Sequence, residues 1–306
     1  MTPTDPGQDA QGGDLAGLVP DIATLRKGLE GTGYLTDEGL ATALFCAVRL
    51  PQPILLEGEA GVGKTQAAKS LASMLGTTLI RLQCYDGIEA AEALYEWNYP
   101  RQLLAIRLAE AEGTHLREAE LFGPDYLVER PLLQAVRHPG PLPAVLLIDE
   151  VDRADEEFEA FLFELLAEGS ITIPEIGTVT ATVPPLAVLT SNRTRDLHDA
   201  LKRRCLYHWI DYPDVGRAAE IIRLHVPSAA ESLTVGVAGA VQRLRSLDLQ
   251  KPPGVAEAID WVGALSLLGA SQLDGDVVGS TLGSALKYRE DLDVALERGV
   301  AWVAGG

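Results

Sequence analysis

The sequence is poor in the residues that form disulfides and metal sites. Its 306 residues include 3 cysteines and 5 histidines. Cys46, Cys84 and Cys205 lie far apart without a CxxC pair, which is typical of reduced thiols in a cytoplasmic protein. A nucleophilic cysteine is the lesser alternative, because no paired base is evident. The histidines show no HExxH-type spacing, which disfavours a metal site built from protein side chains alone.

Basic residues and long apolar runs are also scarce. The chain has 25 Lys and Arg against 44 Asp and Glu, a formal net charge of −19. An acidic chain gains no counterion release from a phosphate backbone, so this charge argues against nucleic acid as the main ligand. The longest apolar run, residues 144–148, has the length of a strand and predicts no membrane insertion.

The N-terminal segment has neither a basic start nor an apolar core, so it does not resemble a signal peptide. Its Pro, Gly and Asp content predicts a flexible tail over residues 1–20. These features lead us to expect a cytoplasmic protein.

Strands and helices alternate over residues 21–212. Short apolar runs predict buried strands at 54–56, 78–83, 144–148 and 186–189. Helical spacing predicts helices at 21–30, from the N-cap Thr36 to Pro51, at 64–75, within 87–95, 101–112 and 131–138, at 155–168 and from His198. This order is typical of an α/β domain with a parallel sheet. Residues 171–173 and 178–180 predict an additional β-hairpin.

Beyond residue 212 the pattern becomes helical. Helices are expected at 216–225, 232–246, 254–268 and 278–303, which predicts a separate all-helical domain over residues 213–306. Trp261 has helical spacing from Leu265 and is expected in the core of that domain. Trp97 lies in an aromatic cluster that either packs internally or contacts a partner, and packing is slightly favoured.

A glycine-rich loop follows the strand at 54–56. It consists of Gly58, Glu59, Ala60, Gly61, Val62, Gly63, Lys64 and Thr65, a complete GxxxxGKT pattern, with Gln66 after it. Glycines let backbone N–H groups approach phosphates closely, and the helix that begins near Lys64 directs its positive end at them. Lys64 supplies a cation to the β- and γ-phosphates of ATP, and the Thr65 hydroxyl is a ligand for Mg²⁺. A plain glycine-rich turn is the weaker interpretation.

Two acidic residues, Asp149 and Glu150, follow the strand at 144–148. Ligands of open α/β sheets bind at the carboxyl ends of strands. Asp149 is therefore placed to hold Mg²⁺ through its water shell, and Glu150 to take a proton from the water that attacks the γ-phosphate. The alternative is an acidic helix cap, since further acidic residues follow closely.

Two further features indicate chemistry only together with the glycine-rich loop and the Asp149–Glu150 pair. Asn192 ends the strand at 186–189 and is either a turn residue or an amide that hydrogen-bonds the attacking water or the γ-phosphate. Arg203 and Arg204 end a short helix and are either a solvated basic pair or the source of an arginine finger.

The motifs GEAGVGKT, LLIDEVDRAD, LTSN and ALKRRC together resemble the AAA+ ATPases, and within them the MoxR-type branch. The stretches LYEWNYPRQLL, ELFGPDYLVERPLLQAVRH and RRCLYHWIDYPD make the sequence most similar to the CoxD-like members associated with carbon monoxide dehydrogenase maturation. The likeness spans about residues 21–270. It implies an αβα P-loop core, a helical lid and a ring, usually a hexamer, with ATP bound between subunits.

The resemblance also implies residue roles. Lys64 and Thr65 would be the Walker A pair, Asp149 and Glu150 the Walker B pair, and Asn192 sensor 1. Arg204 would be the finger by its position, with Arg203 as the alternative. The hairpin at 171–180 resembles the insertion that this branch carries before sensor 1, and 87–112 a second insertion on the substrate-facing side of the ring. The family's lid commonly has a sensor-2 arginine, but residues 251–257 contain none, so either Lys251 substitutes or the lid is coupled differently.

We therefore expect an ATPase ring that remodels a client protein. The resemblance implies a metalloenzyme client and a von Willebrand A-domain partner. A nucleotide-gated assembly scaffold with little turnover is the alternative, although a scaffold needs neither a catalytic base nor a finger. A small-molecule kinase is disfavoured by the Asp149–Glu150 pair and the all-helical C-terminal domain.

Overall fold

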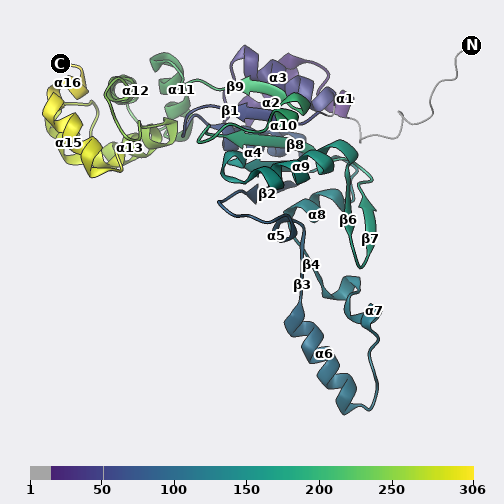
Figure 1. Ribbon diagram of the computed structural model, residues 1–306. Helices are drawn as coiled ribbons and strands as arrows, with labels where there is room; N and C mark the ends of the chain where they lie inside the picture. The colour runs from purple at the N-terminus through teal and green to yellow at the C-terminus, as the bar shows by residue number, and fades with distance from the viewer. Residues whose placement is uncertain (1–14, 51) are drawn as a thin grey trace, which may run out of the picture. The chain divides into compact units, whose positions relative to one another are not determined.

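The computed structural model describes residues 15–50 and 52–306, and its contacts divide the chain into two units (Figure 1). We call the first the core unit, which comprises described residues 15–28, 36–57 and 68–208. We call the second the lid unit, which comprises residues 29–35, 58–67 and 209–306. The predicted tail lies outside the described residues up to residue 14, and helix α1 occupies Leu15–Leu18.

A five-stranded sheet forms the centre of the core unit. Its order is β2-β5-β8-β1-β9, and the pairings β2–β5, β5–β8 and β8–β1 are parallel. The strands are β1 (Ile54–Glu57), β2 (Leu79–Gln83), β5 (Val145–Asp149), β8 (Leu186–Ser191) and β9 (Leu206–Trp209). The predicted parallel α/β fold is confirmed, and β9 is an additional strand that the sequence pattern did not predict. In this order the carboxyl ends of β1, β8 and β5 lie along one edge.

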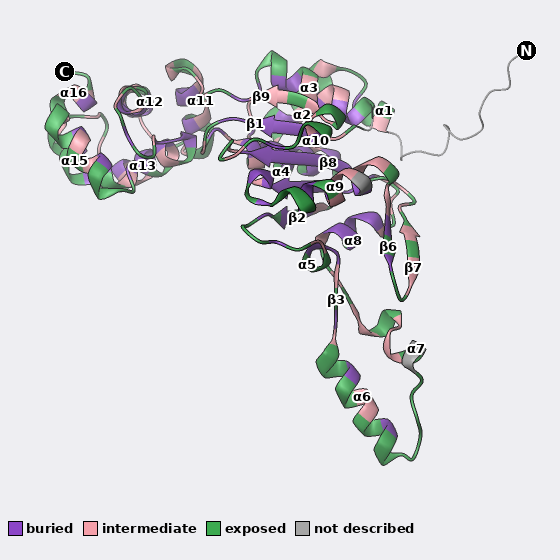
Figure 2. Ribbon diagram, in the orientation of Figure 1, coloured by how far each residue is buried: buried purple, intermediate pink, exposed green. Residues whose placement is uncertain are grey.

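Helices cover the sheet, so its middle strands are buried (Figure 2). Every residue of β5 is buried, as expected for a strand with both faces covered. Leu146 and Ile148 of β5 pack with Leu133 of α8 and Phe158 of α9. The helices are α2 (Ile22–Gly31), α3 (Glu38–Arg49), α4 (Lys64–Leu75), α5 (Ala90–Leu94), α8 (Pro131–Val136), α9 (Glu156–Glu168) and α10 (Asp199–Arg204).

The helix ends show where local chemistry decides the boundaries. Asp37, and not the predicted Thr36, is the N-cap of α3, because its carboxylate accepts the Leu40 N–H at 2.7 Å. Asp155 caps α9 in the same way through the Phe158 N–H at 2.8 Å. The predicted end of that helix at Gly169 is confirmed.

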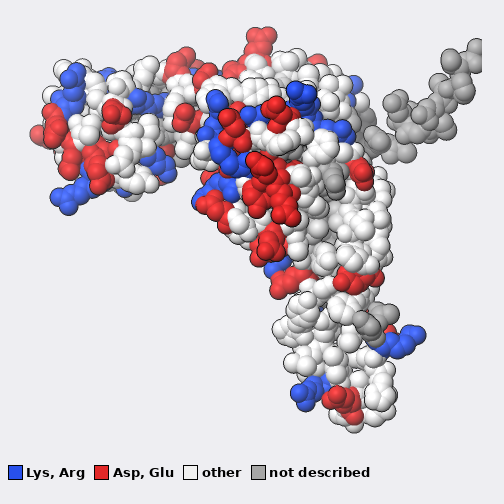
Figure 3. All heavy atoms as spheres, in the orientation of Figure 1, with Lys and Arg blue, Asp and Glu red and all other residues white. Residues whose placement is uncertain are grey.

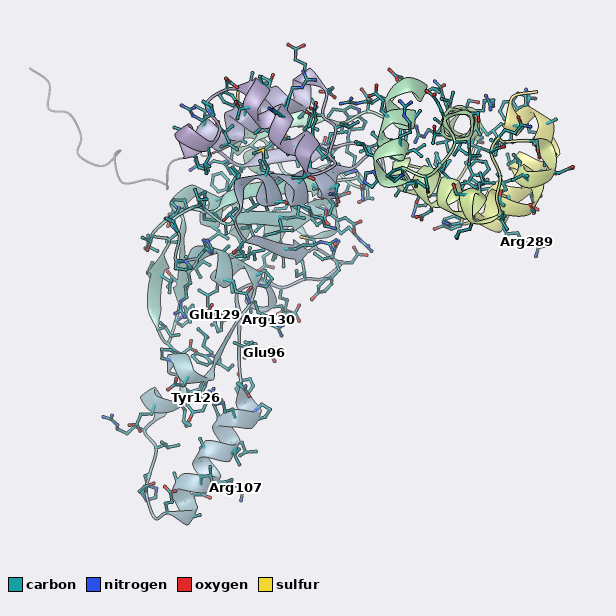
Figure 4. All side chains as sticks on the ribbon, turned by 180° about the vertical axis from the view of Figure 1, so that it is seen from behind. Glu96, Arg107, Tyr126, Glu129, Arg130 and Arg289 are labelled. Atoms are coloured by element: carbon teal, nitrogen blue, oxygen red, sulfur yellow. The ribbon has the colours of Figure 1, made fainter. Side chains whose placement is uncertain are left out.

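Residues 95–129 form a projection that we call the arm (Figures 1 and 4). The sequence predicted helices here, and the structure adds a two-stranded antiparallel ribbon at its base. The arm contains β3 (Tyr95–Trp97), α6 (Tyr99–Ala111), α7 (Glu118–Leu121) and β4 (Leu127–Glu129). Trp97 is buried and packs edge-on against Tyr95 and Phe122, which confirms the packing interpretation.

Ion pairs hold the base of the arm to the core unit. Arg130 pairs with Glu96, and the Arg137 Nη1 atom lies 2.7 Å from Glu129 Oε1 (Figure 4). Further out, α6 carries a set of large apolar side chains that are exposed within the described residues. Its members are 55–63% exposed: Tyr99, Leu103, Leu104 and Leu108.

A separate hairpin lies in the core unit after α9. It pairs β6 (Ser170–Ile173) with β7 (Gly177–Thr180), close to the predicted ranges. The Thr172 and Thr178 hydroxyls lie 3.0 Å apart across it.

The lid unit is helical beyond residue 213, as predicted. It contains α11 (Val215–His225), α12 (Glu231–Arg245), α13 (Val255–Leu267), α14 (Gly275–Thr281), α15 (Arg289–Arg298) and α16 (Val300–Ala304). The prediction of one helix over 278–303 is wrong, because the chain breaks after Thr281 and again at Gly299. Trp261 is fully buried in this unit's core, as expected, and its Nε1–H donates to Thr281 Oγ1 at 2.8 Å.

Two of the three thiols, those of Cys84 and Cys205, do not favour nucleophilic chemistry. Burial raises the pKa of Cys84 and of Cys205 to about 12, and the nearby Asp149 carboxylate adds to the shift of Cys84. Both thiols therefore stay protonated near neutral pH. Within residues 15–50 and 52–306, no helix has the length and apolar character to cross a bilayer.

Candidate nucleotide-binding and hydrolysis site

Asp149 is the last residue of β5 and is 2% exposed. Its Oδ1 atom accepts the Thr190 hydroxyl at 2.6 Å, and its Oδ2 atom accepts Arg81 Nη2 at 2.6 Å. Thr190 is on β8 and Arg81 on β2, so strands on both sides fix this carboxylate. A buried carboxylate requires such partners to remain ionised.

Glu150 follows in a left-handed backbone conformation with φ 55°. This conformation is rare for a residue with a Cβ atom and is typical of functional sites. The Glu150 N–H donates to Thr190 Oγ1 at 2.9 Å, while Gln83 Nε2 donates to Glu150 Oε2 at 3.0 Å. Asn192 Nδ2 lies 3.5 Å from Glu150 Oε1. The structure thus brings together Glu150 and Asn192, which are far apart in sequence.

Asp152 is a further site residue that sequence reasoning missed. It is 1% exposed and accepts the backbone N–H of Asn192 at 3.2 Å and of Thr194 at 2.8 Å. These bonds fix the turn after β8 that carries Asn192. Gln83 and Thr190 were missed too. The register that pairs Gln83 with Asp149 would have revealed the first of them, but register is not visible in a single sequence.

The glycine-rich loop, residues 58–65, lies between β1 and α4 as predicted. Gly58 and Gly61 have φ values of 152° and 76°. A Cβ atom on Gly58 would lie 2.3 Å from the Ile210 carbonyl oxygen, so the loop's path there excludes a side chain. The Lys64 ammonium donates to the carbonyls of Gly58 and Glu59 at 2.6 and 2.7 Å. The loop therefore curves around a cationic group, as a phosphate cradle requires.

The start of α13 lies directly against this loop within the lid unit. The Val255 N–H donates to the Gly61 carbonyl at 3.0 Å, and a Cβ atom on Gly254 would lie 2.6 Å from Gly61 Cα. The Tyr212 hydroxyl donates to the Ala60 carbonyl at 3.2 Å. The start of α13 thus contacts the loop through its backbone and without an arginine side chain, and the Lys251 side chain is exposed.

A half-buried arginine, Arg245, supports these lid contacts. The Arg245 guanidinium carbon lies 3.8 Å from the centroid of the Tyr212 ring, and its Nε–H donates to the Pro253 carbonyl at 2.7 Å. Arg245 therefore joins the end of α12 to the segment that leads into α13. Desolvation lowers the pKa of Arg245 from its ordinary value, which agrees with its enclosed position.

The two arginines of α10 have different surroundings. Arg204 Nη2 lies 3.4 Å from the Ala167 carbonyl oxygen, and its guanidinium stacks 5.6 Å from the Phe163 ring centroid. Arg203 is exposed. Both are on the surface of the core unit, where a finger must be.

The residues present suit a nucleotide-bound Mg²⁺ more than a protein-only metal site. No group of three or more His, Cys, Asp or Glu residues is placed to hold a metal ion in the part of the chain that the structure describes. The Thr65 hydroxyl and the Asp149 carboxylate are each an oxygen ligand of the kind that Mg²⁺ prefers. The face of the core unit seen in Figure 3 carries a cluster of acidic side chains, in the region of α9.

These features define the class of protein. A family model of the AAA domain, dynein-related subfamily, matches residues 53–205, which is half of the chain. The chain belongs to this family. It is a nucleotide-binding AAA+ ATPase, and this part of the resemblance seen in the sequence is confirmed.

The chain is also similar to particular proteins. Protein NorQ of Paracoccus denitrificans is 24% identical over 75% of this chain and 80% of its own length. The denitrification regulatory protein NirQ of Stutzerimonas stutzeri is 24% identical over 65% of this chain and 66% of its own. A solved structure of a RuvB variant from Thermotoga maritima, 18% identical, covers 85% of this chain and 71% of that chain with a TM-score of 0.48. The CoxD-like assignment stays a prediction.

We predict that Gly254→Ala moves the start of α13 away from the glycine-rich loop. Because the new methyl group would meet the backbone of Gly61, the Val255–Gly61 hydrogen bond cannot persist unchanged. We expect the free energy of unfolding to fall by about 1–3 kcal/mol and the affinity for a fluorescent ATP analogue to fall with it. Gly263→Ala on the same helix is the control, since its Cβ atom would meet nothing within 4 Å. Equal nucleotide affinity in the two variants would contradict the assigned contact.

Proposed function

We propose that the chain hydrolyses ATP with the residues that its sequence marks. Residues 58–66 would hold the phosphates, with Lys64 neutralising their charge. Thr65 and Asp149 would hold Mg²⁺, which when bound neutralises charge that develops on the phosphate oxygens. The observation that carries this proposal is the position of the Glu150 carboxylate, held between Gln83 and Asn192 beside the buried Asp149.

Each residue has a separate task in this proposal. The Glu150 carboxylate accepts a proton from the attacking water, and the Asn192 amide orients that water. The left-handed conformation of Glu150 turns its carboxylate away from the line of β5. Asp149 can therefore serve as the metal ligand and the adjacent Glu150 as the base. Thr190 supports both, since its hydroxyl donates to Asp149 and accepts the Glu150 N–H.

We propose further that subunits form a ring, which in this family is usually a hexamer. In it Arg204, or else Arg203, would stabilise the transition state on a neighbour's nucleotide. The ring would remodel or mature a client, in our proposal a metalloenzyme, together with a von Willebrand A-domain partner. Similarity to the denitrification regulatory protein NirQ supports a regulatory role. A scaffold with little turnover is disfavoured, because it has no use for a positioned Glu150.

Phosphate release tests the ATPase proposal. Wild type, Lys64→Ala and Glu150→Gln are compared over a range of protein concentrations, with a fluorescent ATP analogue as a second readout. Lys64→Ala should lose nucleotide binding, because the loop loses its cation. Glu150→Gln should bind nucleotide but lose turnover, because an amide accepts no proton. Lys69→Ala is the control, an exposed lysine on the same helix.

The dependence on concentration separates the two candidate functions. Specific activity that rises with wild-type concentration indicates catalysis at an interface between subunits. Turnover that persists in the Glu150→Gln variant would exclude Glu150 as the base. Nucleotide binding without turnover in the wild type, at every concentration, would favour the scaffold.

Mixing variants tests the finger. We expect Arg204→Ala to bind nucleotide normally and lose about a thousandfold in turnover. Mixed with Lys64→Ala, which keeps its arginines, it should regain part of that turnover, because one mixed interface joins a nucleotide to a finger. Arg203→Ala is measured in the same way, and a larger loss there would assign the role to Arg203. No recovery in either mixture would argue against a finger acting between subunits.

The arm is the surface that we propose for the client. Leu103→Ser, Leu104→Ser and Leu108→Ser combined should leave ATP hydrolysis intact, because these side chains are exposed and contribute little to the core. Proteins retained from a host cell extract by Glu150→Gln, identified by mass spectrometry, should be lost from the triple variant in that background. Leu267→Ser in the lid unit is the control, since Leu267 is 91% exposed. Unchanged retention would place the client elsewhere.

A further inference from the structure

The Arg81 guanidinium binds the same carboxylate that the proposed function assigns to Mg²⁺. We propose that Arg81 is a built-in competitor of that cation: it neutralises Asp149 in the resting site and raises the Mg²⁺ concentration at which nucleotide binds. This inference rests on the proposed role of Asp149 as a metal ligand. Arg81 is on β2, outside every motif described above.

The contact is specific in its geometry. Arg81 Nε and Nη2 lie 3.0 and 2.6 Å from one oxygen, Asp149 Oδ2. In the parallel register of β2 and β5, Gln83 faces Asp149 and Arg81 faces Leu147. The Arg81 side chain therefore extends forward along β2, toward the carboxyl edge of the sheet, to reach the carboxylate.

Both oxygens of the carboxylate have hydrogen-bond donors. Oδ2 accepts the two Arg81 nitrogens, and Oδ1 accepts the Thr190 hydroxyl at 2.6 Å. A carboxylate oxygen accepts about two hydrogen bonds, so Oδ2 is saturated by Arg81 alone. A cation, or a water in its shell, that binds Oδ2 must displace or share that contact. A guanidinium close to a divalent cation also repels it, and this repulsion is strong near a buried group.

The unequal burial of the pair makes Arg81 the partner that moves. The Asp149 side chain is 3% exposed and the Arg81 side chain 46% exposed. Arg81 regains water when it leaves, whereas Asp149 stays buried and loses one positive charge from its surroundings. Mg²⁺ supplies that charge. Arg81 and Mg²⁺ are therefore alternative counter-ions for one carboxylate.

A purely structural role for Arg81 predicts the opposite sign. If the ion pair only held Asp149 in its rotamer, loss of the guanidinium would disorder a metal ligand and weaken Mg²⁺ binding. In the competitor role its loss strengthens Mg²⁺ binding. The direction of the change therefore separates the two roles.

The experiment is a Mg²⁺ titration of the full chain with a fluorescent, slowly hydrolysed ATP analogue, read as nucleotide binding. Arg81→Gln removes the charge and keeps a similar length, while Arg81→Lys keeps the charge and loses the fork. Arg137→Gln is the control, because it breaks an Arg–Glu pair of the same unit at the base of the arm. Urea unfolding of each variant confirms that it is folded, and affinity in EDTA measures the metal-free contribution.

We expect Arg81→Gln to lower the half-saturating Mg²⁺ concentration about tenfold, the effect of one neighbouring charge. Arg81→Lys should lower it less, and Arg137→Gln should match wild type. A half-saturating Mg²⁺ concentration that rises or stays unchanged in both Arg81 variants would overturn the competitor role of Arg81. It would leave the proposed metal role of Asp149 standing. Wild-type nucleotide binding without any Mg²⁺ dependence would overturn both the inference and the proposed metal role of Asp149.

Discussion

The pairing of β5 with β8 is the constraint on which the hydrolysis site depends. Asp149 is buried, and a buried carboxylate is stable only with partners that satisfy its charge and lone pairs. Thr190 of β8 meets this need at 2.6 Å and fixes the backbone of Glu150 at 2.9 Å with the same hydroxyl. A slip of one residue in this register would turn Thr190 to the other face of the sheet and leave both acidic residues unsupported. The parallel register is therefore a requirement of the chemistry as well as of the core.

The glycine-rich loop depends on a different kind of interaction. Where the loop meets α13, Gly61 and Gly254 approach each other backbone to backbone, so side chains contribute little to this contact. The Val255 N–H and the Tyr212 hydroxyl then bind two successive loop carbonyls. Contacts of this kind respond to any change in the path of the loop, since no flexible side chain absorbs it. This offers a physical account of how a lid without an arginine at 251–257 follows the state of the loop.

Much of the core could be predicted from local patterns, and the errors occur where tertiary packing decides. The apolar runs at 144–148 and 186–189 identified buried strands, because a strand covered on both faces is apolar throughout. The ribbon β3–β4 was missed, since Tyr95 and Leu127 gain their strand character only by pairing across the base of the arm. The long helix expected at 278–303 is wrong, because the backbone is extended at Tyr288 and Gly299 has a φ of 106°. Trp97 shows the same limit: its burial against Phe122 joins residues that are far apart in sequence.

The site divides along the same line. The sequence by itself determined the loop residues 58–65, the pair Asp149 and Glu150, and the candidates Asn192, Arg203 and Arg204, because each belongs to a contiguous motif whose spacing reflects its chemistry. Only the tertiary structure decided that Arg81 shares a carboxylate with Thr190, that Asp152 fixes the turn of Asn192, and that Gly254 meets the loop. The reason is that strand order and register bring residues together irrespective of their separation along the chain. A single sequence encodes that order only through packing of the whole domain.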